Sequence, residues 1–260
     1  MKYMIPKIIH IFWNDLKHIP EVVKLLIQNI KLKNPDFKVI LYGENDIPFP
    51  IYKKVMPQYL SDIFRLYILY VKGGVYLDAS IICVQSITCA FDLNDPRLQG
   101  YEYPTGGLNM ENYAMAVEKN NKFVLEWLKE CLEVNKLGAK AYVKKNKKYV
   151  NPELQKQLPY LANFLAYSVA SYHLFQKKVK ENNYIKLNIK SIDENGPLYY
   201  FINHHKNSNK AVEYLLNAPK LLHQNCFIKL RGSERKILEE KIKQKKYNLN
   251  SFIIKQLLMK

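Results

Sequence analysis

The spacing of hydrophobic residues between positions 60 and 80 predicts a helix followed directly by a strand. Apolar side chains recur every three or four positions over residues 60–71, the spacing of one buried helical face. Gly73 and Gly74 end this pattern where positive φ costs little, and residues 75–77 form a short apolar run of strand-forming residues. Asp78 therefore lies at the carboxyl end of a predicted strand.

Two charged residues of the same stretch lie on another face of the predicted helix. Asp62 and Arg65 are three positions apart. Because ligands of open α/β sheets bind at the carboxyl ends of strands, these residues and Asp78 together predict a site for an anionic ligand. Each part also has a plainer interpretation, since such a pair is often a surface ion pair worth less than about 1 kcal/mol and Gly-Gly is often an ordinary turn.

The first forty-odd residues have the order of a βαβ unit. Residues 7–13 form a nearly continuous apolar run typical of a central strand, Pro20 suits the first turn of an apolar-faced helix, and residues 37–42 form a second strand. Gly43 is the only glycine before Gly73. The chain therefore lacks a GxGxxG motif or a P-loop here, which disfavours the usual dinucleotide and ATP folds.

The remaining pattern predicts an α/β protein with a helical C-terminal portion. Further strands are expected at residues 81–84 and 185–189, with a hairpin or antiparallel edge formed by residues 99–103 and 113–118. Helices are expected from Asn121, over residues 152–180, and twice from Ser233 onward. The lysine-rich run 136–148 is interpreted as a solvated loop. Residues 158–175 carry no charge but are too short and polar to span a bilayer, which predicts a buried helix.

These elements divide the chain into a main domain, residues 1–232, and a basic helical segment, residues 233–260. That segment is expected to pack on the domain, with binding to an anionic membrane surface as the alternative. The 260 residues are 48% hydrophobic and carry a formal charge of +17, which favours nucleic acid, an anionic membrane or a phosphorylated small molecule as partner. Basic and aromatic residues are not interleaved, so a nucleic-acid-binding protein is the less favoured alternative.

The cysteines and the amino-terminal residues indicate the cellular compartment in which the protein is expected. The four cysteines and six histidines form no zinc pattern, so most cysteines are expected to be buried thiols in a reducing compartment. Pro6, Lys7 and His10 interrupt any signal-peptide core. A cytoplasmic protein, in peripheral contact with a membrane at most, is expected.

Four blocks of the sequence resemble glycosyltransferase family 32, in particular its relatives in capsular polysaccharide synthesis. Residues 5–13 resemble the family's opening strand, and residues 61–65 followed by 73–80 resemble its central block. Residues 195–197 and 222–223 resemble the family more weakly. The resemblance implies a GT-A fold, that is, a Rossmann-type mixed sheet flanked by helices. It also implies retaining transfer of a sugar from a nucleotide sugar, UDP-sugar favoured, to a glycan or other hydroxyl acceptor.

The resemblance also implies roles for individual residues. Trp13 stacks on the nucleobase, Asp62 and Arg65 hold sugar hydroxyls and a phosphate oxygen, and Asp78 is the first acid of the DXD motif. Arg65, Asp62 and Asp78 are thus the candidate catalytic residues. The candidate residues that line the donor site are Ile11, Phe12, Trp13, Asp62, Arg65, Gly74, Tyr76 and Asp78.

A divalent cation, manganese or magnesium, is implied at Asp78, Ser80 and His223. Ser80 replaces the second acid of DXD, and a hydroxyl is a much weaker ligand for a hard cation than a carboxylate. Metal dependence is therefore in doubt. His223 has a structural interpretation as well. A degenerate transferase that binds a nucleotide or glycan without turnover is a further alternative.

Overall fold

A six-stranded mixed sheet forms the centre of the protein. The computed structural model describes residues 4–51, 56–102, 110–150, 162–179, 187–192, 196–201, 205–223 and 225–258. The strand order is β2-β1-β3-β6-β5-β7, in which β6 runs antiparallel to both of its neighbours and the other pairs are parallel. The strands of this sheet are β1 (Ile8–Phe12), β2 (Lys38–Tyr42), β3 (Gly74–Leu77), β5 (Gln99–Glu102), β6 (Met110–Val117) and β7 (Asn188–Ser191).

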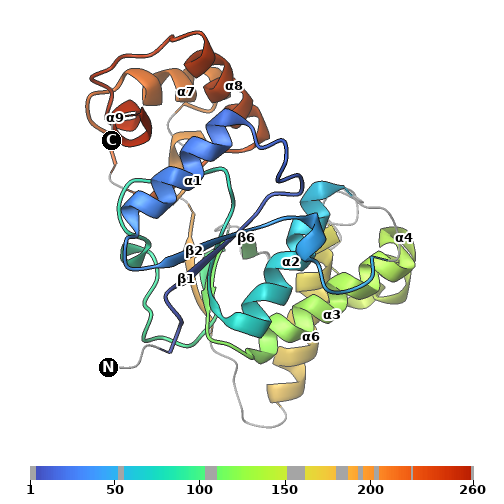
Figure 1. Ribbon diagram of the computed structural model, residues 1–260. Coiled ribbons are helices and arrows are strands. Elements are labelled where there is room, and N and C mark those ends of the chain that lie inside the picture. The colour runs from blue at the N-terminus through green and yellow to red at the C-terminus, as the bar shows by residue number, and fades with distance from the viewer. Residues whose placement is uncertain are drawn as a thin grey trace.

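Helices cover both faces of this sheet. Helix α1 and the C-terminal helices lie on one side, and α2, α3, α4 and α6 lie on the other (Figure 1). The α-helices are α1 (Glu21–Lys33), α2 (Pro57–Lys72), α3 (Lys122–Leu137), α4 (Ala139–Lys145), α6 (Ala162–Val179), α7 (Ser208–Asn217), α8 (Gly232–Lys243) and α9 (Phe252–Leu258). The expected α/β class, with a mixed sheet flanked by helices and a helical C-terminal portion, is confirmed.

The helix and strand predicted around position 70 form as expected. Helix α2 begins at Pro57, ends at Lys72 and is followed at once by β3. Gly73 and Gly74 have φ angles of 65° and 101°. A Cβ on Gly74 would lie 2.7 Å from the Ile8 carbonyl oxygen, so this position needs glycine for both its φ and the close approach of β1.

A separate two-stranded sheet joins the middle of the chain to its C-terminal part. β4 (Ile81–Cys83) pairs antiparallel with β8 (Phe227–Lys229), with Ile81 opposite Lys229. Helices α8 and α9 both pack on α1, and both also contact α7. The C-terminal helices therefore lie on the same side of the large sheet as α1 (Figure 1).

The lysine-rich run is not a loop. It contains α4 and a 3-10 turn, η3 (Lys147–Tyr149), so the prediction of a solvated loop over residues 136–148 is wrong. The physical reason is Tyr142, whose side chain is fully buried among α3 and α6 residues while the neighbouring lysines stay at the surface. The many lysines of this run obscured the hydrophobic pattern of one short amphipathic helix. Two further 3-10 turns are η1 (Glu44–Asp46) and η2 (Ile87–Cys89).

The other predicted elements are confirmed where the structure describes them. Residues 99–102 and 110–117 pair as an antiparallel hairpin, although β7 lies outside β5, so this hairpin is not the sheet edge. Helix α6 is mostly buried over residues 162–171 and partly buried over residues 172–175, and within the described residues no helix is long and apolar enough to cross a membrane. The expected glycine turn at 106–107 and the start of the 152–180 helix lie outside the described residues.

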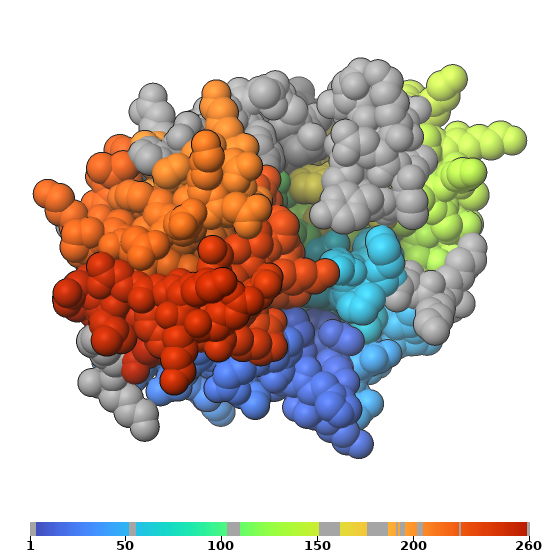
Figure 2. All heavy atoms as spheres, turned by 90° about the horizontal axis from the view of Figure 1, so that it is seen from above, coloured from blue at the N-terminus to red at the C-terminus, as the bar shows by residue number. Residues whose placement is uncertain are grey.

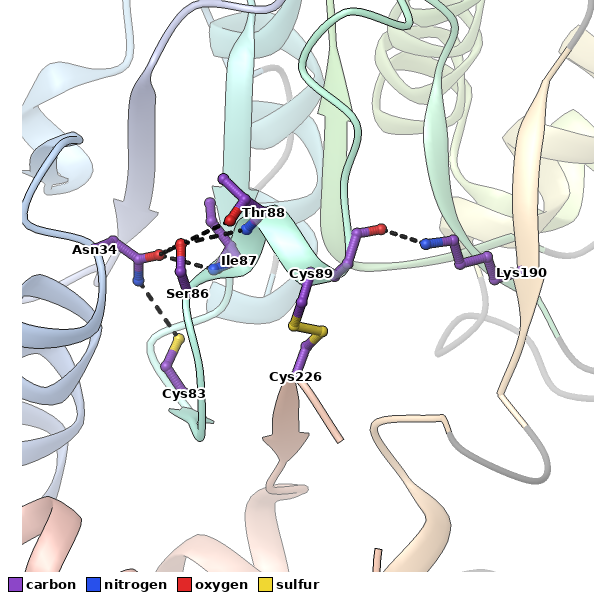
Figure 3. Close-up of a disulfide and its surroundings, with 9 residues drawn as sticks. Asn34, Cys83, Ser86, Ile87, Thr88, Cys89, Lys190 and Cys226 are labelled. Carbon is purple, nitrogen blue, oxygen red and sulfur yellow. Dashed lines mark hydrogen bonds between the residues drawn. A yellow bond between two sulfur atoms is a disulfide. The ribbon is translucent and has the colours of Figure 1, made fainter. Parts of the chain in front are cut away.

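Two of the four cysteines form a disulfide bond. Cys89 and Cys226 are joined, with 5.9 Å between their Cα atoms (Figure 3). Cys83 and Cys131 are buried free thiols, as expected. The expectation of buried thiols is wrong for the bonded pair, because η2 and the residue before β8, 137 positions apart in sequence, meet beside the small sheet. The disulfide ties the end of η2 to the start of β8.

Candidate active site

Residues at the ends of three strands of the large sheet meet at one edge. β1 and β3 are parallel, so Trp13 and Asp78, which follow them, leave the sheet at the same edge. β6 runs the other way, so its first residues, including Glu111 and Asn112, reach this edge as well. The Asp78 N–H donates to the Tyr113 carbonyl oxygen at 2.8 Å, which continues the β3–β6 pairing past the end of β3.

The small sheet brings a lysine to this edge from far along the chain. Lys229 is the last residue of β8 and lies opposite Ile81. The N–H of Leu230 donates to the Ser80 carbonyl oxygen at 2.9 Å, which fixes the backbone of β8 beside the residues that follow β3. Lys229 therefore reaches Asp78 and Ser80 across 151 and 149 positions of sequence.

Arg65 is surrounded by acceptors that belong to the protein. Its Nε donates to the Ser61 carbonyl (3.2 Å), and its Nη1 donates to the backbone and side-chain oxygens of Asn112 (2.6 and 2.8 Å). Nη2 donates to Ser61 Oγ (2.9 Å) and lies 3.2 Å from both Asp62 Oδ1 and Asp78 Oδ1. Only 5% of the Arg65 side chain is exposed. Arg65 therefore holds the two carboxylates in place.

Lys229 contacts both residues of the predicted DXD position. Its Nζ donates to Asp78 Oδ2 at 2.7 Å and to Ser80 Oγ at 2.6 Å. Burial alone would raise the pKa of Asp78, but the charges of Lys229 and Arg65 hold that pKa below its ordinary value. An ammonium group has three N–H donors, and the third finds no acceptor among the described residues.

Two other carboxyl groups at this edge titrate above their ordinary range. Burial raises the pKa of Asp62, although Arg65 and the Asn112 side chain, which donates to Asp62 at 2.9 Å, oppose the shift. Burial also raises the pKa of Glu111 to about 7, with Lys229 acting in the opposite direction. Glu111 is therefore partly protonated at neutral pH.

A second cation lies at the amino end of α8. The guanidinium carbon of Arg235 is 5.1 Å from the centroid of the Trp13 ring, a cation–π contact. Burial lowers the pKa of Arg235. Within the described chain it has no ion-pair partner, although its charge acts on Asp78. Figure 2 shows the surface hollowed between the C-terminal part, in orange and red, and the start of α2, in cyan.

The other predicted donor-site residues are buried. Ile11 and Phe12 are buried in the hydrophobic cores on the two faces of the sheet, and Gly74 lies against β1. Tyr76 is fully buried, donates or accepts a hydrogen bond with Ser61 Oγ (2.9 Å), and lies under the Arg65 guanidinium, 4.7 Å from ring centroid to carbon. Of these four residues, only Tyr76 has a side chain in contact with the site, through Ser61 and Arg65.

His223 does not join the residues around Asp78. Its ring packs on Tyr199 at 4.2 Å between centroids, and its backbone N–H and carbonyl both bond to the Tyr200 hydroxyl. These contacts are structural, and none of them is with Asp78 or Ser80.

Sequence reasoning missed four residues of this site: Glu111, Asn112, Lys229 and Arg235. Glu111 and Asn112 fall at the start of a strand that was predicted to begin at residue 113. Lys229 is one lysine among many basic residues, and only the pairing of β8 with β4 gives it a role. No sequence signal separates it from its neighbours.

The donor atoms at this edge do not fit a divalent cation. The side-chain oxygens of Asp78 and Ser80 that would bind it both accept from Lys229, and the other Asp78 oxygen faces Arg65. A hard cation needs about six oxygen ligands and no ammonium among them. Elsewhere in the described chain, Glu126, Glu130 and His173 have ligand atoms within 4.8 Å of one another, on α3 and α6, but Glu126 already pairs with Lys129 at 3.3 Å.

The protein thus has an α/β fold with a cluster of charged side chains at the carboxyl ends of β1 and β3. Residues 5–100 match the family model described as a glycosyltransferase sugar-binding region containing a DXD motif. This match confirms, over less than half of the chain, the resemblance seen in residues 5–13 and 61–80. That part of the chain is similar to glycosyltransferase sugar-binding regions.

Individual relatives are more distant. An uncharacterized protein of Arabidopsis thaliana is 31% identical over 106 residues, which are 38% of this chain, and the chain spans 15% of that protein's length. The solved PaToxG glycosyltransferase is 21% identical with a TM-score of 0.46, covering 68% of this chain and 74% of that one. A glycosyltransferase involved in glycosylation of the major capsid of PBCV-1 is 17% identical with a TM-score of 0.41, covering 90% and 98%. These similarities are too weak to transfer a substrate.

Proposed function

We propose that this protein is a glycosyltransferase that takes a sugar from a nucleotide sugar, UDP-sugar favoured, and transfers it to a hydroxyl of a glycan or other acceptor with retention. The observation that carries the proposal is the cluster of Asp62, Arg65 and Asp78. The three side chains meet at the carboxyl edge of the sheet, inside the segment that matches the sugar-binding family model.

Each side chain has a role that its contacts support. Asp62 and Asp78 present carboxylate oxygens that accept from hydroxyls of the sugar and ribose. Arg65 has its donors occupied by Ser61, Asn112 and the two carboxylates, so it positions them and does not bind phosphate. Trp13 is partly buried, and the ring face opposite Arg235 stacks on the nucleobase.

The reaction itself exchanges one bond for another at the anomeric carbon. The bond from that carbon to the terminal phosphate oxygen breaks, and its electron pair leaves with the nucleoside diphosphate. The acceptor oxygen forms the new bond, and its proton is taken up by the departing diphosphate. Negative charge develops on the diphosphate, so cations fixed beside it lower the barrier most.

Partners and compartment follow from charge and cysteine chemistry. The formal charge of +17 suits an anionic donor and peripheral contact with an anionic membrane. Nucleic acid is not a partner that we propose. The Cys89–Cys226 disulfide favours an oxidising compartment, whereas the expected reducing cytoplasm rests on Cys83 and Cys131 alone.

Donor hydrolysis and binding test this proposal. A panel of UDP- and GDP-sugars is offered to the purified full chain, and binding of UDP and GDP is measured by calorimetry. We expect one donor to be hydrolysed or transferred, and Asp78→Asn to lower kcat/KM by about 100-fold or more. Binding of a nucleoside diphosphate without turnover of any donor and acceptor supports a degenerate transferase. If neither diphosphate binds, the proposal is wrong.

A further inference from the structure

We propose that the Lys229 ammonium occupies the position that a divalent cation would take beside Asp78 and Ser80, and that this protein binds the diphosphate of its donor without a metal ion. The inference rests on the proposed function and deepens it, since it assigns the groups that receive the charged part of the substrate.

The first support is the geometry at the two predicted metal ligands. One ammonium nitrogen lies 2.7 Å from Asp78 Oδ2 and 2.6 Å from Ser80 Oγ, so it bridges the first and last positions of the DXD-like motif. These are the two side chains that a cation would bridge. Ser80 suits this arrangement, because a hydroxyl accepts well from an ammonium group while binding a hard divalent cation poorly.

The second support is the charge balance of the site. Two carboxyl groups, Asp62 and Asp78, face three cations, Arg65, Lys229 and Arg235. A third carboxyl group at this edge, Glu111, is partly protonated at neutral pH because burial raises its pKa to about 7, so the acids of the site do not outnumber its cations. A divalent cation would therefore meet no surplus of negative charge in this partly buried place, whereas the cations already present favour a diphosphate.

The third support is that Lys229 and Arg235 have N–H groups without a partner among the described residues. Lys229 has a third N–H without an acceptor among the described residues, and its side chain is 13% exposed. Arg235 has no carboxylate partner within the described chain. Arg65, by contrast, donates to the protein alone. Lys229 and Arg235 are therefore the two cations that can receive phosphate oxygens.

The chemical role of Lys229 follows from this placement. When the bond between the sugar and the diphosphate breaks, the electron pair moves onto the phosphate oxygen. Lys229 keeps its proton and donates a hydrogen bond to the diphosphate, and Asp78 and Ser80 hold the ammonium in position. A fixed ammonium then stabilises the leaving group through charge and hydrogen bonding.

The decisive test compares metal dependence with Lys229 dependence in the full chain. UDP and GDP affinities are measured by calorimetry in EDTA, in Mn²⁺ and in Mg²⁺. For wild type we expect the affinity of the bound diphosphate to change less than about 2-fold between these conditions. Lys229→Gln should weaken it about 100-fold in all three. Lys236→Gln, an exposed lysine of α8, is the matched control and should change nothing.

A second variant tests the position itself and needs no donor. Lys229→Ala combined with Ser80→Asp removes the ammonium and restores the second acid, so this double variant should bind one Mn²⁺ where wild type binds none, as measured by electron paramagnetic resonance of free Mn²⁺. If wild type itself binds Mn²⁺ and its UDP affinity rises 10-fold or more with the metal, while Lys229→Gln changes nothing, the inference is overturned and the proposed function stands. If no nucleoside diphosphate binds with or without metal, both are overturned.

Discussion

The two sides of the candidate site differ in what their cations are bound to. On the side of α2 and β3, Arg65 is buried and its donors are used by Ser61, Asn112, Asp62 and Asp78. On the side of β8 and α8, Lys229 has one N–H without an acceptor in the described part of the chain, and Arg235 packs on Trp13. The comparison separates a cation that organises the site from cations that are open to a ligand.

Removing the Arg65 charge should give the largest loss of stability. Arg65→Met leaves Asp62 and Asp78 buried beside one another without their shared cation, and breaking a buried pair in this way costs about 3–5 kcal/mol. Urea unfolding followed by circular dichroism measures the loss. Lys229→Met should cost less, because Asp78 keeps Arg65 as a partner.

An exposed ion pair provides the matched control for that measurement. Arg97 pairs with Asp95 through a side chain that is 43% exposed and therefore screened by solvent, so Arg97→Met should cost much less stability than Arg65→Met. Equal losses for Arg65→Met and Lys229→Met would show that the two cations are equivalent, and the distinction between the two sides of the site would then be wrong.

The disulfide gives a second and smaller test, because it ties β8, the strand that carries Lys229, to η2. Cys226→Ser should lower the stability by about 2–4 kcal/mol under oxidising conditions, since the bond closes a loop of 137 residues in the unfolded chain. The same variant should equal wild type once both are reduced with dithiothreitol.

The double variant Cys89→Ser with Cys226→Ser completes the test of the disulfide. It should be no less stable than either single variant, because each single substitution already removes the whole bond. Additive losses would mean that the two sulfur atoms act separately, and that β8 is not anchored to η2 in solution.

The difference between the α2–β3 side and the β8–α8 side also explains which residues of the site can be predicted from the sequence. Asp62, Arg65, Gly73, Gly74 and Asp78 lie within seventeen positions, and periodicity places the first two on one helix and Asp78 at the end of the strand that follows. The order of βαβ elements and the two C-terminal helices are predicted for the same reason, since each depends on local spacing.

The other half of the site depends on contacts that no local pattern encodes. Lys229 becomes part of it only because β8 pairs with β4, and Arg235 only because α8 packs near the end of β1. The prediction of a loop at residues 136–148 failed for a related reason, since the burial of one tyrosine, Tyr142, decides that these residues form a helix. In a chain with 40 lysines and arginines, charge alone does not single out a functional cation.

The smallest predicted effect concerns Glu111, which lies between the two sides. Its folded pKa of about 7 exceeds its ordinary value of 4.5, so between these pH values the folded state binds more protons than the unfolded state. Stability contributed by this group is therefore present below pH 4.5 and is lost as the pH rises through 7. Glu111→Gln mimics the protonated form and should remove this loss.

The difference between wild type and Glu111→Gln isolates this group from others that titrate nearby. His10, whose pKa burial lowers to about 4, makes stability rise with pH over part of the same range, but it is present in both proteins and cancels. We expect equal unfolding free energies near pH 4.5 and an advantage of about 1 kcal/mol for Glu111→Gln above pH 7, discounted for partial exposure. Glu213→Gln, at an exposed position of α7, should show no such divergence. A wild type that gains stability over Glu111→Gln as the pH rises would mean that Glu111 is ionised and paired with Lys229, and that the lysine is not free to receive a diphosphate.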